Sequence, residues 1–451
     1  MVMPQDLSIV RREEYCSDNE FSPVRVMQIE LAGPLPAVAR AERYNKVWVL
    51  GRVHGEPIGT CMIKIPVTGL TPGALGEELW REFERPIRER FAAARLPEPA
   101  GITSDGLSVD PAQWPFQQRK TALLAAPPFI TVLICTRDRP DQLANCLQRL
   151  DGQQYPNFEV VVVENVPRGD TVRVMVEARQ GAVPHRYLVE SQSGLCRSRN
   201  TGIAAAASQI VAFLDDDAEP DPHWLAGIAS GFARGDDIGC VSGAILPARI
   251  DTPAQELFEW LGGHSKDRGF SPIIFSRDGL QSPLFPLPPF GAGANLAFRR
   301  AAFEKIGGFD VALGAGTPAR AGADTLAITL ILLEGYRIAY EPAALMWHHH
   351  RRDITGLREQ LEGYSVGLSA YYTALLRHRP GVLPGLLKLT PSLLRYLRGG
   401  SHDRGPEPPP EILAELNRRH ARCMISGPFA YFKSMRLQAR LRPLSHETVY
   451  R

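Results

Sequence analysis

The sequence predicts an α/β protein organised around a doubly wound sheet. From Phe129 onward, apolar and β-rich runs such as FITVLICT, FEVVVVEN and IVAFL alternate with helical patterns. Continuous apolar runs are typical of parallel strands that are covered on both faces, and strand–helix alternation favours right-handed crossovers between them. The 451 residues exceed one ordinary domain, so further units are expected on either side of this one.

The first unit, residues 1–94, is predicted to be a small accessory α+β domain. Its strand-like runs VRVMQIEL, KVWVLGRVHG and IGTCMIKI precede a charged helical pattern that contains Pro86. None of these runs ends in a carboxylate cluster, so we expect acceptor recognition or self-association rather than a contribution to a metal site. His54 is interpreted as a turn residue. Residues 95–127 are rich in Pro and Ala, which predicts a linker.

The central unit, residues 128–355, carries the alternating pattern. Within RPDQLANCLQRLDGQ the apolar residues recur at helical spacing, and SGLCRSRNTGIAAAAS indicates a loop that feeds an Ala-rich helix. In TLAITLILLEG, Gly335 suits the position just after a helix end. The predicted core faces of these two helices consist of Leu143, Cys146, Leu147 and Leu150 in the first, and Leu326, Thr329, Leu330 and Leu333 in the second.

Composition excludes several classes of protein. Lys+Arg 51 against Asp+Glu 49 leaves a net charge of +2, which gives no bulk electrostatic case for nucleic-acid binding. The seven cysteines form no CxxC pair, which argues against a disulfide framework or a zinc ribbon and predicts a reduced, cytoplasmic location. Neither a signal peptide nor an apolar run of about 18 residues is apparent.

Polar residues follow three of the predicted strands, in CTRDRP, VENVP and DDDAEP. Ligands in open α/β sheets bind beyond the carboxyl ends of the strands. Two unit charges about 4 Å apart repel by roughly 4 kcal/mol at an effective dielectric near 20. The repulsion among the aspartates 215–217 is therefore expected to be offset by a cation, a hydrogen-bonded ligand or open solvent. A solvated loop is the alternative, which their position at a strand end makes weaker.

These segments, in this order, resemble the family 2 inverting glycosyltransferases of the GT-A fold. The resemblance covers about half of the chain and is carried by FITVLICTRDRPDQLANCLQRL, GLCRSRNTG, FLDDD and GAGANLAFRRAAFEKIGGFD. It implies a GT-A-type nucleotide-sugar-binding domain that moves a sugar from a nucleotide-sugar, expected to be a UDP-sugar, to a hydroxyl acceptor. It also implies Mn²⁺ or Mg²⁺, because a divalent cation stabilises the departing diphosphate.

The resemblance assigns roles to residues of this chain. Asp217 would bind the metal directly, while Asp215 and Asp216 would reach the ribose or a metal-bound water. Thr136, Arg139 and Glu164 would surround the nucleoside. Arg199 and Asn200 would close the nucleotide pocket. Gly293 and Asn295 would lie in a loop beside the sugar or the acceptor. The family commonly has Asp where Glu164 stands, so the contact to the base is expected to differ.

The resemblance also implies the catalytic base and one further metal ligand. Inverting transfer needs a general base for the acceptor hydroxyl, and the family uses the Asp of a Glu-Asp pair that reads Ala323-Asp324 here. Asp324 is therefore the expected base, with acceptor positioning left open by Ala323. Three adjacent histidines on an extended chain cannot all face one ion, because side chains alternate. His348 is favoured as the ligand, and His350 comes second.

Other interpretations stay open at this point. Residues 356–451 are expected to be helical, and 356–398 mix apolar runs with Arg and Lys, so they would lie on a membrane surface or pack as ordinary helices. The acceptor would be a carbohydrate, lipid-linked, peptide or small-molecule hydroxyl. Trp260 and residues 270–290 would form an acceptor lid or fill hydrophobic space. One rival function is a nucleotidyltransferase. Such enzymes usually carry a Gly-rich loop after the first strand, but the segment CTRDRPDQL contains no glycine. The other rival function is an inactive carbohydrate-binding scaffold.

Overall fold

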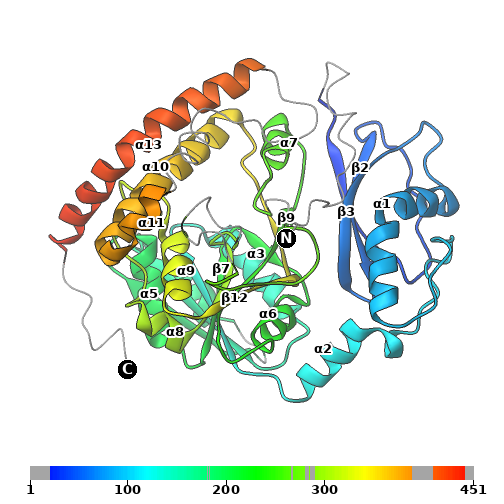
Figure 1. Ribbon diagram of the computed structural model, residues 1–451, viewed down its shortest axis with the longest axis horizontal. Helices are drawn as coiled ribbons and strands as arrows, with labels where there is room; N and C mark the ends of the chain where they lie inside the picture. Colours follow the sequence, from blue (N-terminus) through cyan, green and yellow to red (C-terminus); the bar gives the residue numbers. More distant parts are fainter. Residues whose placement is uncertain are drawn as a thin grey trace.

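The computed structural model describes residues 21–179, 181, 183–265, 268–279, 284, 290–388 and 410–441. A central α/β domain lies between an N-terminal sheet-and-helix unit and a set of C-terminal helices (Figure 1). The predicted fold class is confirmed, including the helical C-terminal region. Residues 1–20 of the predicted accessory domain, and most of the proposed lid between 280 and 289, lie outside the described residues.

The central sheet is mixed, with strands in the order β10-β12-β9-β11-β7-β4-β5-β6 and β8 paired to β12. The strands β4, β5, β6 and β7 run parallel, whereas β11 is antiparallel to both of its neighbours, β7 and β9. The bounds are β4 (Ile130–Thr136), β5 (Phe158–Asn165), β6 (His185–Glu190), β7 (Ile210–Asp215), β8 (Ala218–Pro220), β9 (Ile238–Pro247), β10 (Ile273–Phe275), β11 (Asn295–Arg299) and β12 (Arg337–His348).

The strand order reverses at β4, and this reversal locates the site. From β4 the chain steps outward through β5 to β6, and it then returns to the other side of β4 with β7. The crevice beyond the carboxyl ends at such a reversal is the usual ligand site of an open α/β sheet. Thr136 ends β4 and Asp215 ends β7, where Asp215 pairs in register with Cys135. The aspartate run therefore begins at the reversal point.

Helices cover both faces of this sheet. One buried core gathers residues of α3 (Pro140–Asp151), α4 (Thr171–Glu177) and α6 (Trp224–Phe232). The other core gathers residues of α5 (Leu195–Ala205), α8 (Arg300–Lys305) and α9 (Ala323–Leu333). The predicted core faces are confirmed, because every residue predicted for them is buried except the half-buried Leu333. Gly335 follows α9 with a φ of 89°, the left-handed conformation expected after a helix end.

The N-terminal unit places one helix on a three-stranded sheet. Its elements are β1 (Val24–Glu30), β2 (Lys46–Val53), β3 (Glu56–Lys64) and α1 (Pro72–Ala93). β1 is parallel to β2, and β3 is antiparallel to it. His54 has a φ of 48° in the β2–β3 turn, which confirms the turn interpretation. Ile102, Leu107 and Trp114 join the buried core of this unit, so much of the predicted linker packs with it.

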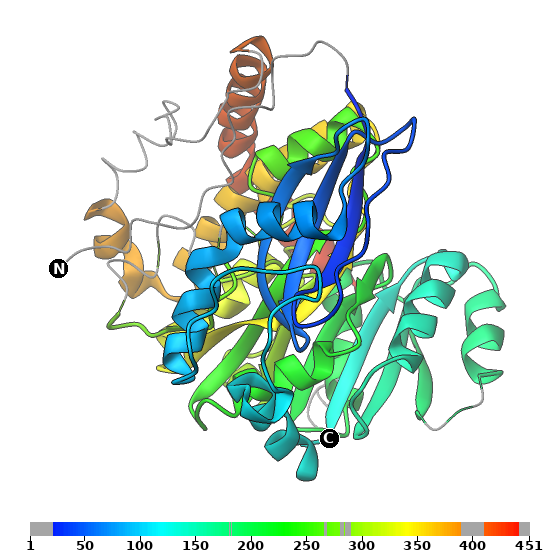
Figure 2. The same cartoon turned by 90° about the vertical axis from the view of Figure 1, so that its right-hand side faces the viewer.

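This unit docks on the central domain through a shared core. Trp48 of β2 packs edge-on against Trp347 of β12, with ring centroids 6.3 Å apart. Arg52 forms a buried ion pair with Asp221, which lies four residues beyond Asp217. Figure 2 shows the N-terminal sheet lying against the central domain. Helix α2 (Pro115–Ala125), preceded by the short 3₁₀ turn η2 (Pro111–Gln113), leads the chain into β4.

The C-terminal helices pack on the α9 side of the central domain. They are α10 (Ile354–His378), η3 (Pro380–Val382), α11 (Leu383–Lys388) and α13 (Pro410–Gln438), with α10 and α13 side by side (Figure 1). A Cβ at Gly427 of α13 would lie 1.9 Å from the Ser369 hydroxyl of α10, so the two helices cross closely. For α10, ordinary helix packing is therefore observed. Residues 389–398 of the segment considered for a membrane lie outside the described residues.

Candidate active site

Asp216 is the buried anchor of the aspartate run. Thr136 donates a hydrogen bond to its Oδ2 at 2.7 Å, and Arg139 donates to its Oδ1 at 3.1 Å. Burial raises the pKa of Asp216, while the bonds from Thr136 and Arg139 lower it. These contacts bring together three of the predicted donor residues. They also fix the turn after β7, so that the two flanking aspartates are held in place.

Asp217 faces His348 across the mouth of this turn. Its Oδ1 lies 3.8 Å from Nε2 of His348, and its Oδ2 lies 3.5 Å from Nη1 of Arg139. Oxygen and nitrogen ligands sit about 2.0–2.2 Å from a first-row divalent ion, so one ion can touch both residues. Burial lowers the pKa of His348 to about 4, which leaves the imidazole neutral and able to bind a metal. These two residues fit the predicted metal site.

Asp215 and Asp324 are joined through one buried cation, Arg199. The Arg199 side chain is only 4% exposed; its Nη2 lies 3.6 Å from Asp215, and its Nη1 forms an ion pair with Asp324. The guanidinium also lies over the rings of Phe213 and Phe309, at 5.4 and 5.3 Å. The two carboxylates raise the pKa of Arg199 although burial opposes them, so it carries a full charge at any working pH.

The pKa of Asp215 is raised to about 7, first by burial and then by its carboxylate neighbours, while Arg199 opposes the rise. The neighbours that raise it include Asp217 and Asp324. The ionised form of Asp215 is therefore disfavoured even with Arg199 present. A divalent cation bound beside it would favour the ionised form.

Gly293 makes room for the expected base. A Cβ at this position would lie 1.9 Å from Oδ2 of Asp324, closer than any real contact. The Gly293 carbonyl also accepts a hydrogen bond from Arg199 at 3.3 Å. The structure therefore places Gly293 against the carboxylate of Asp324, and the glycine is needed for that close approach.

We expect Gly293→Ala to lower turnover on the order of 100-fold, since an ångström-scale displacement of a reacting group has about that effect. Gly169→Ala is the matched control, because a Cβ there meets nothing within 4 Å. Steady-state rates and thermal melting of both variants provide the measurement. Normal turnover in Gly293→Ala would contradict the packing argument.

Three of the residues predicted to contact the donor have partners within the protein, and their donor roles stay predictions. Arg199 and Asn200 are predicted to close the nucleotide pocket. The guanidinium of Arg199 forms an ion pair with Asp324 and lies near Asp215. The Asn200 amide is bonded to the backbone of Phe309, accepting at 2.9 Å and donating at 3.0 Å. Asn295 accepts from the Trp224 indole and donates to the carbonyls of Ala244 and Ala344. Buried amides require such partners, and here they fasten strands and loops to one another.

Glu164 stays a prediction as a contact to the nucleobase. It is the last residue but one of β5 and pairs in register with Thr136, and its carboxylate accepts a hydrogen bond from Tyr187 at 2.6 Å. The position is therefore at the correct edge of the sheet, with a carboxylate that is already oriented. Ala323 is the first residue of α9 and is buried in the core, so this position offers no polar group to an acceptor.

Sequence reasoning missed the residues that orient the site. Arg199 was not recognised as the partner of Asp324, because the two are 125 residues apart in the chain. His264 and Glu259, which lie beside His350 and His348, were not singled out either. Arg199 itself was singled out for the nucleotide pocket, and the Ala-rich sequence that follows it is a local signal that this charge is buried.

Comparison with known proteins finds a family to which the sequence of the central domain is similar. Residues 131–307 match the sequence model of Glycosyl transferase family 2. The central domain of this chain is therefore similar to the family 2 glycosyltransferases. The match spans β4 to α8, and it therefore includes the Asp216 anchor, the aspartate run and Arg199 but ends before Asp324.

Several known proteins are similar to this chain. A glucosyl-dolichyl phosphate glucuronosyltransferase of Haloferax volcanii is 24% identical over 52% of this chain and 75% of its own length. The glycosyltransferase AglE of the same organism is 35% identical over 22% of this chain, but that is only 33% of its length. A pre-mycofactocin glycosyltransferase of Mycobacterium tuberculosis is 24% identical over 50% of this chain and 43% of its length.

Among solved structures, mannosyltransferase PcManGT of Pyrobaculum calidifontis, in complex with GDP-Man and Mn²⁺, is similar at 19% identity. The comparison covers 72% of this chain and 80% of that one, with a TM-score of 0.42. Because this score is low, the assignment of the fold depends on the strand order of the sheet and on the family match. Of the functions considered, the family match supports a glycosyltransferase over a nucleotidyltransferase.

Proposed function

We propose that the protein is a metal-dependent, inverting glycosyltransferase that moves a sugar from a nucleotide-sugar, expected to be a UDP-sugar, to a hydroxyl acceptor. The observation that carries the proposal is the buried guanidinium of Arg199, which has Asp215 and Asp324 on either side of it. In this proposal Asp324 is the carboxylate on the acceptor side and Asp215 is the carboxylate on the donor side, and Arg199 lies between them. A single-displacement reaction needs one general base, and Asp324 supplies it.

Each residue of the site has a defined task in this proposal. Asp217 and His348 would hold the divalent ion, with Asp215 completing the acidic environment; the ion would neutralise the charge of the departing diphosphate. Thr136 and Arg139 keep the turn in place through Asp216. Asp324 takes the proton of the acceptor hydroxyl, and Arg199 keeps that carboxylate oriented toward the site.

A panel of nucleotide-sugars tests the proposal, incubated with and without Mn²⁺ or Mg²⁺ and with a mixed set of hydroxyl acceptors. Release of nucleoside diphosphate that depends on the metal, with inversion at the anomeric carbon of the product, is the expected result. Pyrophosphate formation would indicate nucleotidyl transfer instead. Donor binding without any product would indicate an inactive carbohydrate-binding scaffold, the alternative motivated by Ala323.

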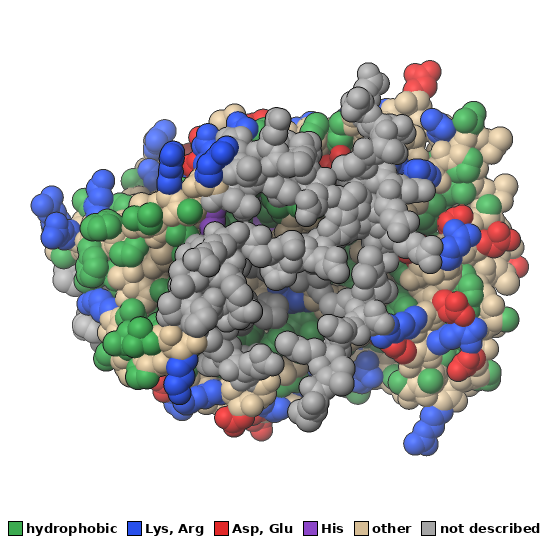
Figure 3. Space-filling view, turned by 45° about the horizontal axis from the view of Figure 1, so that its top comes forward, with side chains coloured by type: hydrophobic (Ala, Val, Ile, Leu, Met, Phe, Trp, Pro, Cys, Tyr) green, Lys and Arg blue, Asp and Glu red, His purple; other side chains and the backbone are tan. Residues whose placement is uncertain are grey.

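We also propose a peripheral membrane contact, on the cytoplasmic side, through α13 rather than α10. Exposed apolar residues line one side of α13, with Phe429 75% exposed. Basic residues continue this side in both directions, and no acidic residue occurs between 418 and 441. Figure 3 shows hydrophobic and basic side chains close together at the left of the molecule, on the side of the C-terminal helices. The residues of this stripe are Arg418, Arg422, Ile425, Phe429, Phe432, Lys433, Arg436 and Arg440.

No helix among the described residues is long and apolar enough to cross a membrane. The α13 stripe instead suits the surface of an anionic bilayer, since aromatic side chains insert and basic ones pair with headgroups. A lipid-linked acceptor would be presented at such a surface. The glucuronosyltransferase relative, whose name specifies a dolichyl phosphate substrate, motivates this acceptor class.

Replacing Phe429 and Phe432 together by Glu should weaken binding to vesicles of anionic phospholipid by more than tenfold, because each buried aromatic contributes about 1.5–3 kcal/mol. Val67→Glu is the control, since Val67 is 83% exposed in the N-terminal unit. Vesicle co-sedimentation at low and high salt is the measurement. Equal binding of the double variant and the control would refute the contact.

A further inference from the structure

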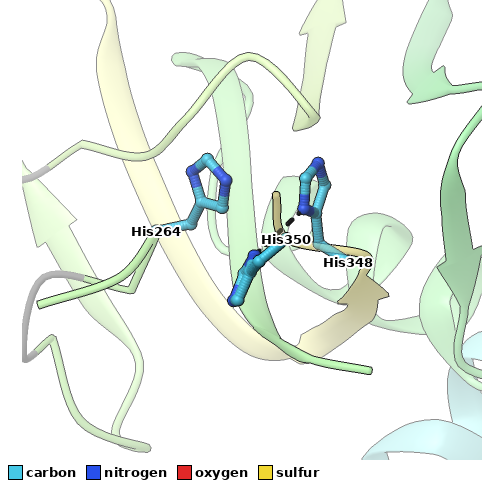
Figure 4. A group of neighbouring side chains, drawn as sticks. All are labelled: His264, His348 and His350. Carbon is cyan, nitrogen blue, oxygen red and sulfur yellow. Dashed lines mark hydrogen bonds between the residues drawn. The ribbon is translucent and has the colours of Figure 1, made fainter. Parts of the chain in front are cut away.

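Three imidazoles from two separate segments converge beside the aspartate run. His264 follows α7 (Pro253–Trp260), His348 ends β12, and His350 comes two residues later. One ring nitrogen of each lies within 4.8 Å of the other two. Figure 4 shows the rings gathered around a common space, with His264 on a loop opposite the end of β12. His264 and His350 are buried, at 8% and 4% exposed, so this is not a chance surface grouping.

The spacing of two of these nitrogens matches that of metal ligands. Nδ1 of His348 lies 3.2 Å from Nδ1 of His350. Two nitrogens bound to one tetrahedral ion at about 2.0–2.1 Å would lie roughly 3.3 Å apart. His264 closes the group from the opposite side, with its ring centroid 4.7 Å from that of His348 and 5.7 Å from that of His350. A small adjustment of this one ring would complete a three-nitrogen face.

An outer layer of contacts orients the rings. Glu259 of α7 accepts a hydrogen bond from Nε2 of His350 at 2.8 Å. The proton of His350 is then on Nε2, and Nδ1 presents its lone pair to the centre of the group. Carboxylate–histidine pairs of this kind fix the tautomer of metal-binding histidines. The ring of Phe258 packs against both His264 and His350, with centroids 5.0 and 4.7 Å away.

The loop is shaped to keep Glu259 in this position. Gly263 has a φ of 52°, and a Cβ there would lie 2.5 Å from Oε1 of Glu259. His349, in contrast, points away and bonds Glu219 at 2.8 Å. The alternation expected for adjacent histidines is therefore confirmed: His348 and His350 share one side, and the third imidazole comes from a distant loop instead of from His349.

We propose that His264, His348 and His350 bind one divalent transition-metal ion of the zinc class. Imidazole nitrogens suit zinc, nickel and iron, whereas the magnesium class prefers carboxylate and water oxygens. Three histidines are also the protein ligand set that leaves a fourth position open on zinc. Such an ion ties the loop that follows α7 to the end of β12. The proposal concerns an ion other than the one held by Asp217, and it does not depend on the transfer reaction.

The two ions share His348, and this has a chemical consequence. A neutral imidazole has one lone pair, so His348 ligates either through Nδ1 toward His350 or through Nε2 toward Asp217. With an ion among the three histidines, Nε2 of His348 carries the proton and faces the Asp217 carboxylate. Zinc at this site therefore removes one ligand from the ion at Asp217.

The test is a titration of the metal-free protein with Co²⁺, read from its visible absorption, followed by displacement with Zn²⁺ against a chromophoric chelator. One ion per chain is expected. His264→Ala and His350→Ala should each weaken Zn²⁺ binding by more than 100-fold, and Glu259→Gln by about 10–100-fold, as for other outer partners of metal-binding histidines. His349→Ala is the matched control and should bind Zn²⁺ normally.

Asp217→Ala should also retain Zn²⁺ binding, which separates the two sites. Loss of Zn²⁺ binding in Asp217→Ala, with retention in His264→Ala, would assign the ion to the carboxylates and overturn the proposal. Absence of binding in the parent protein, or unchanged binding in both His264→Ala and Glu259→Gln, would overturn it as well. Melting curves of the metal-free variants check the fold, and Glu259→Gln decides the outcome if His264→Ala does not fold.

Discussion

Asp217→Ala should abolish metal-dependent binding of the donor while leaving the melting temperature nearly unchanged. The side chain is 27% exposed, and its contacts to Arg139 at 3.5 Å and to His348 at 3.8 Å are long. Arg139 keeps its hydrogen bond to Asp216 when Asp217 is removed. No buried polar group therefore loses its only partner, and the loss is confined to the metal.

Calorimetric titration of the nucleotide-sugar in the presence of Mn²⁺ measures this effect. Asp236→Ala is the matched control, because Asp236 is an exposed aspartate that precedes β9 and so lies at the opposite end of the sheet. Asp216→Ala would be a poor test, since it leaves the buried Thr136 hydroxyl without its acceptor and destabilises the turn. Unchanged metal-dependent affinity in Asp217→Ala would remove this residue from the metal site.

Much of the fold was accessible from the sequence because the relevant signals are local. The core face of α3 follows from helical spacing within twelve residues, and β4, β5 and β7 follow from uninterrupted apolar runs. The place of the aspartates follows from the same signals, since Asp215 must come where the apolar run ends. These elements need no knowledge of distant partners, and the structure has them as predicted.

The rest depends on contacts between segments far apart in the chain. Asn295 looks like a loop residue after GAGA, yet its amide joins carbonyls of Ala244 and Ala344 about 50 residues away on either side. The core shared by Trp48 and Trp347 is equally invisible, because each tryptophan fits its own strand without the other. The resemblance to a family assigned the site residues from their positions in the sequence motifs. It could not distinguish a group that contacts the donor from one that holds the backbone.

The same limit applies to Arg199, whose partners define what it does. The buried guanidinium pairs with Asp324 on one side and approaches Asp215 on the other, and its predicted contact to the nucleotide stays a prediction. Its charge couples the two carboxylates, since any change at one of them alters the electrostatics of the other. Arg199 is therefore a positioning residue, and removal of one member of such a buried pair costs about 3–5 kcal/mol of stability.

Asp324→Asn should lower turnover by about 100-fold or more with donor affinity preserved. The amide keeps an oxygen that accepts from Arg199 and still fits against Gly293, so the shape of the site is retained. It cannot take the acceptor proton, and general base catalysis contributes about 10²–10⁴-fold. Single-turnover rates and donor titration, measured on the same preparation, separate the two effects.

Two other carboxylates serve as controls because the structure gives them different partners. Asp310 accepts hydrogen bonds from His378 at 2.9 Å and from Tyr431 at 2.7 Å, so it joins α10 and α13 to the domain. Glu334 pairs with Arg379 at the far end of α9, about 15 Å from Asp324 at 1.5 Å per residue. Asp310→Asn should therefore lower the melting temperature more than the turnover, and Glu334→Gln should change neither. Near-normal turnover in Asp324→Asn, with a large loss in either control, would move the base to that residue.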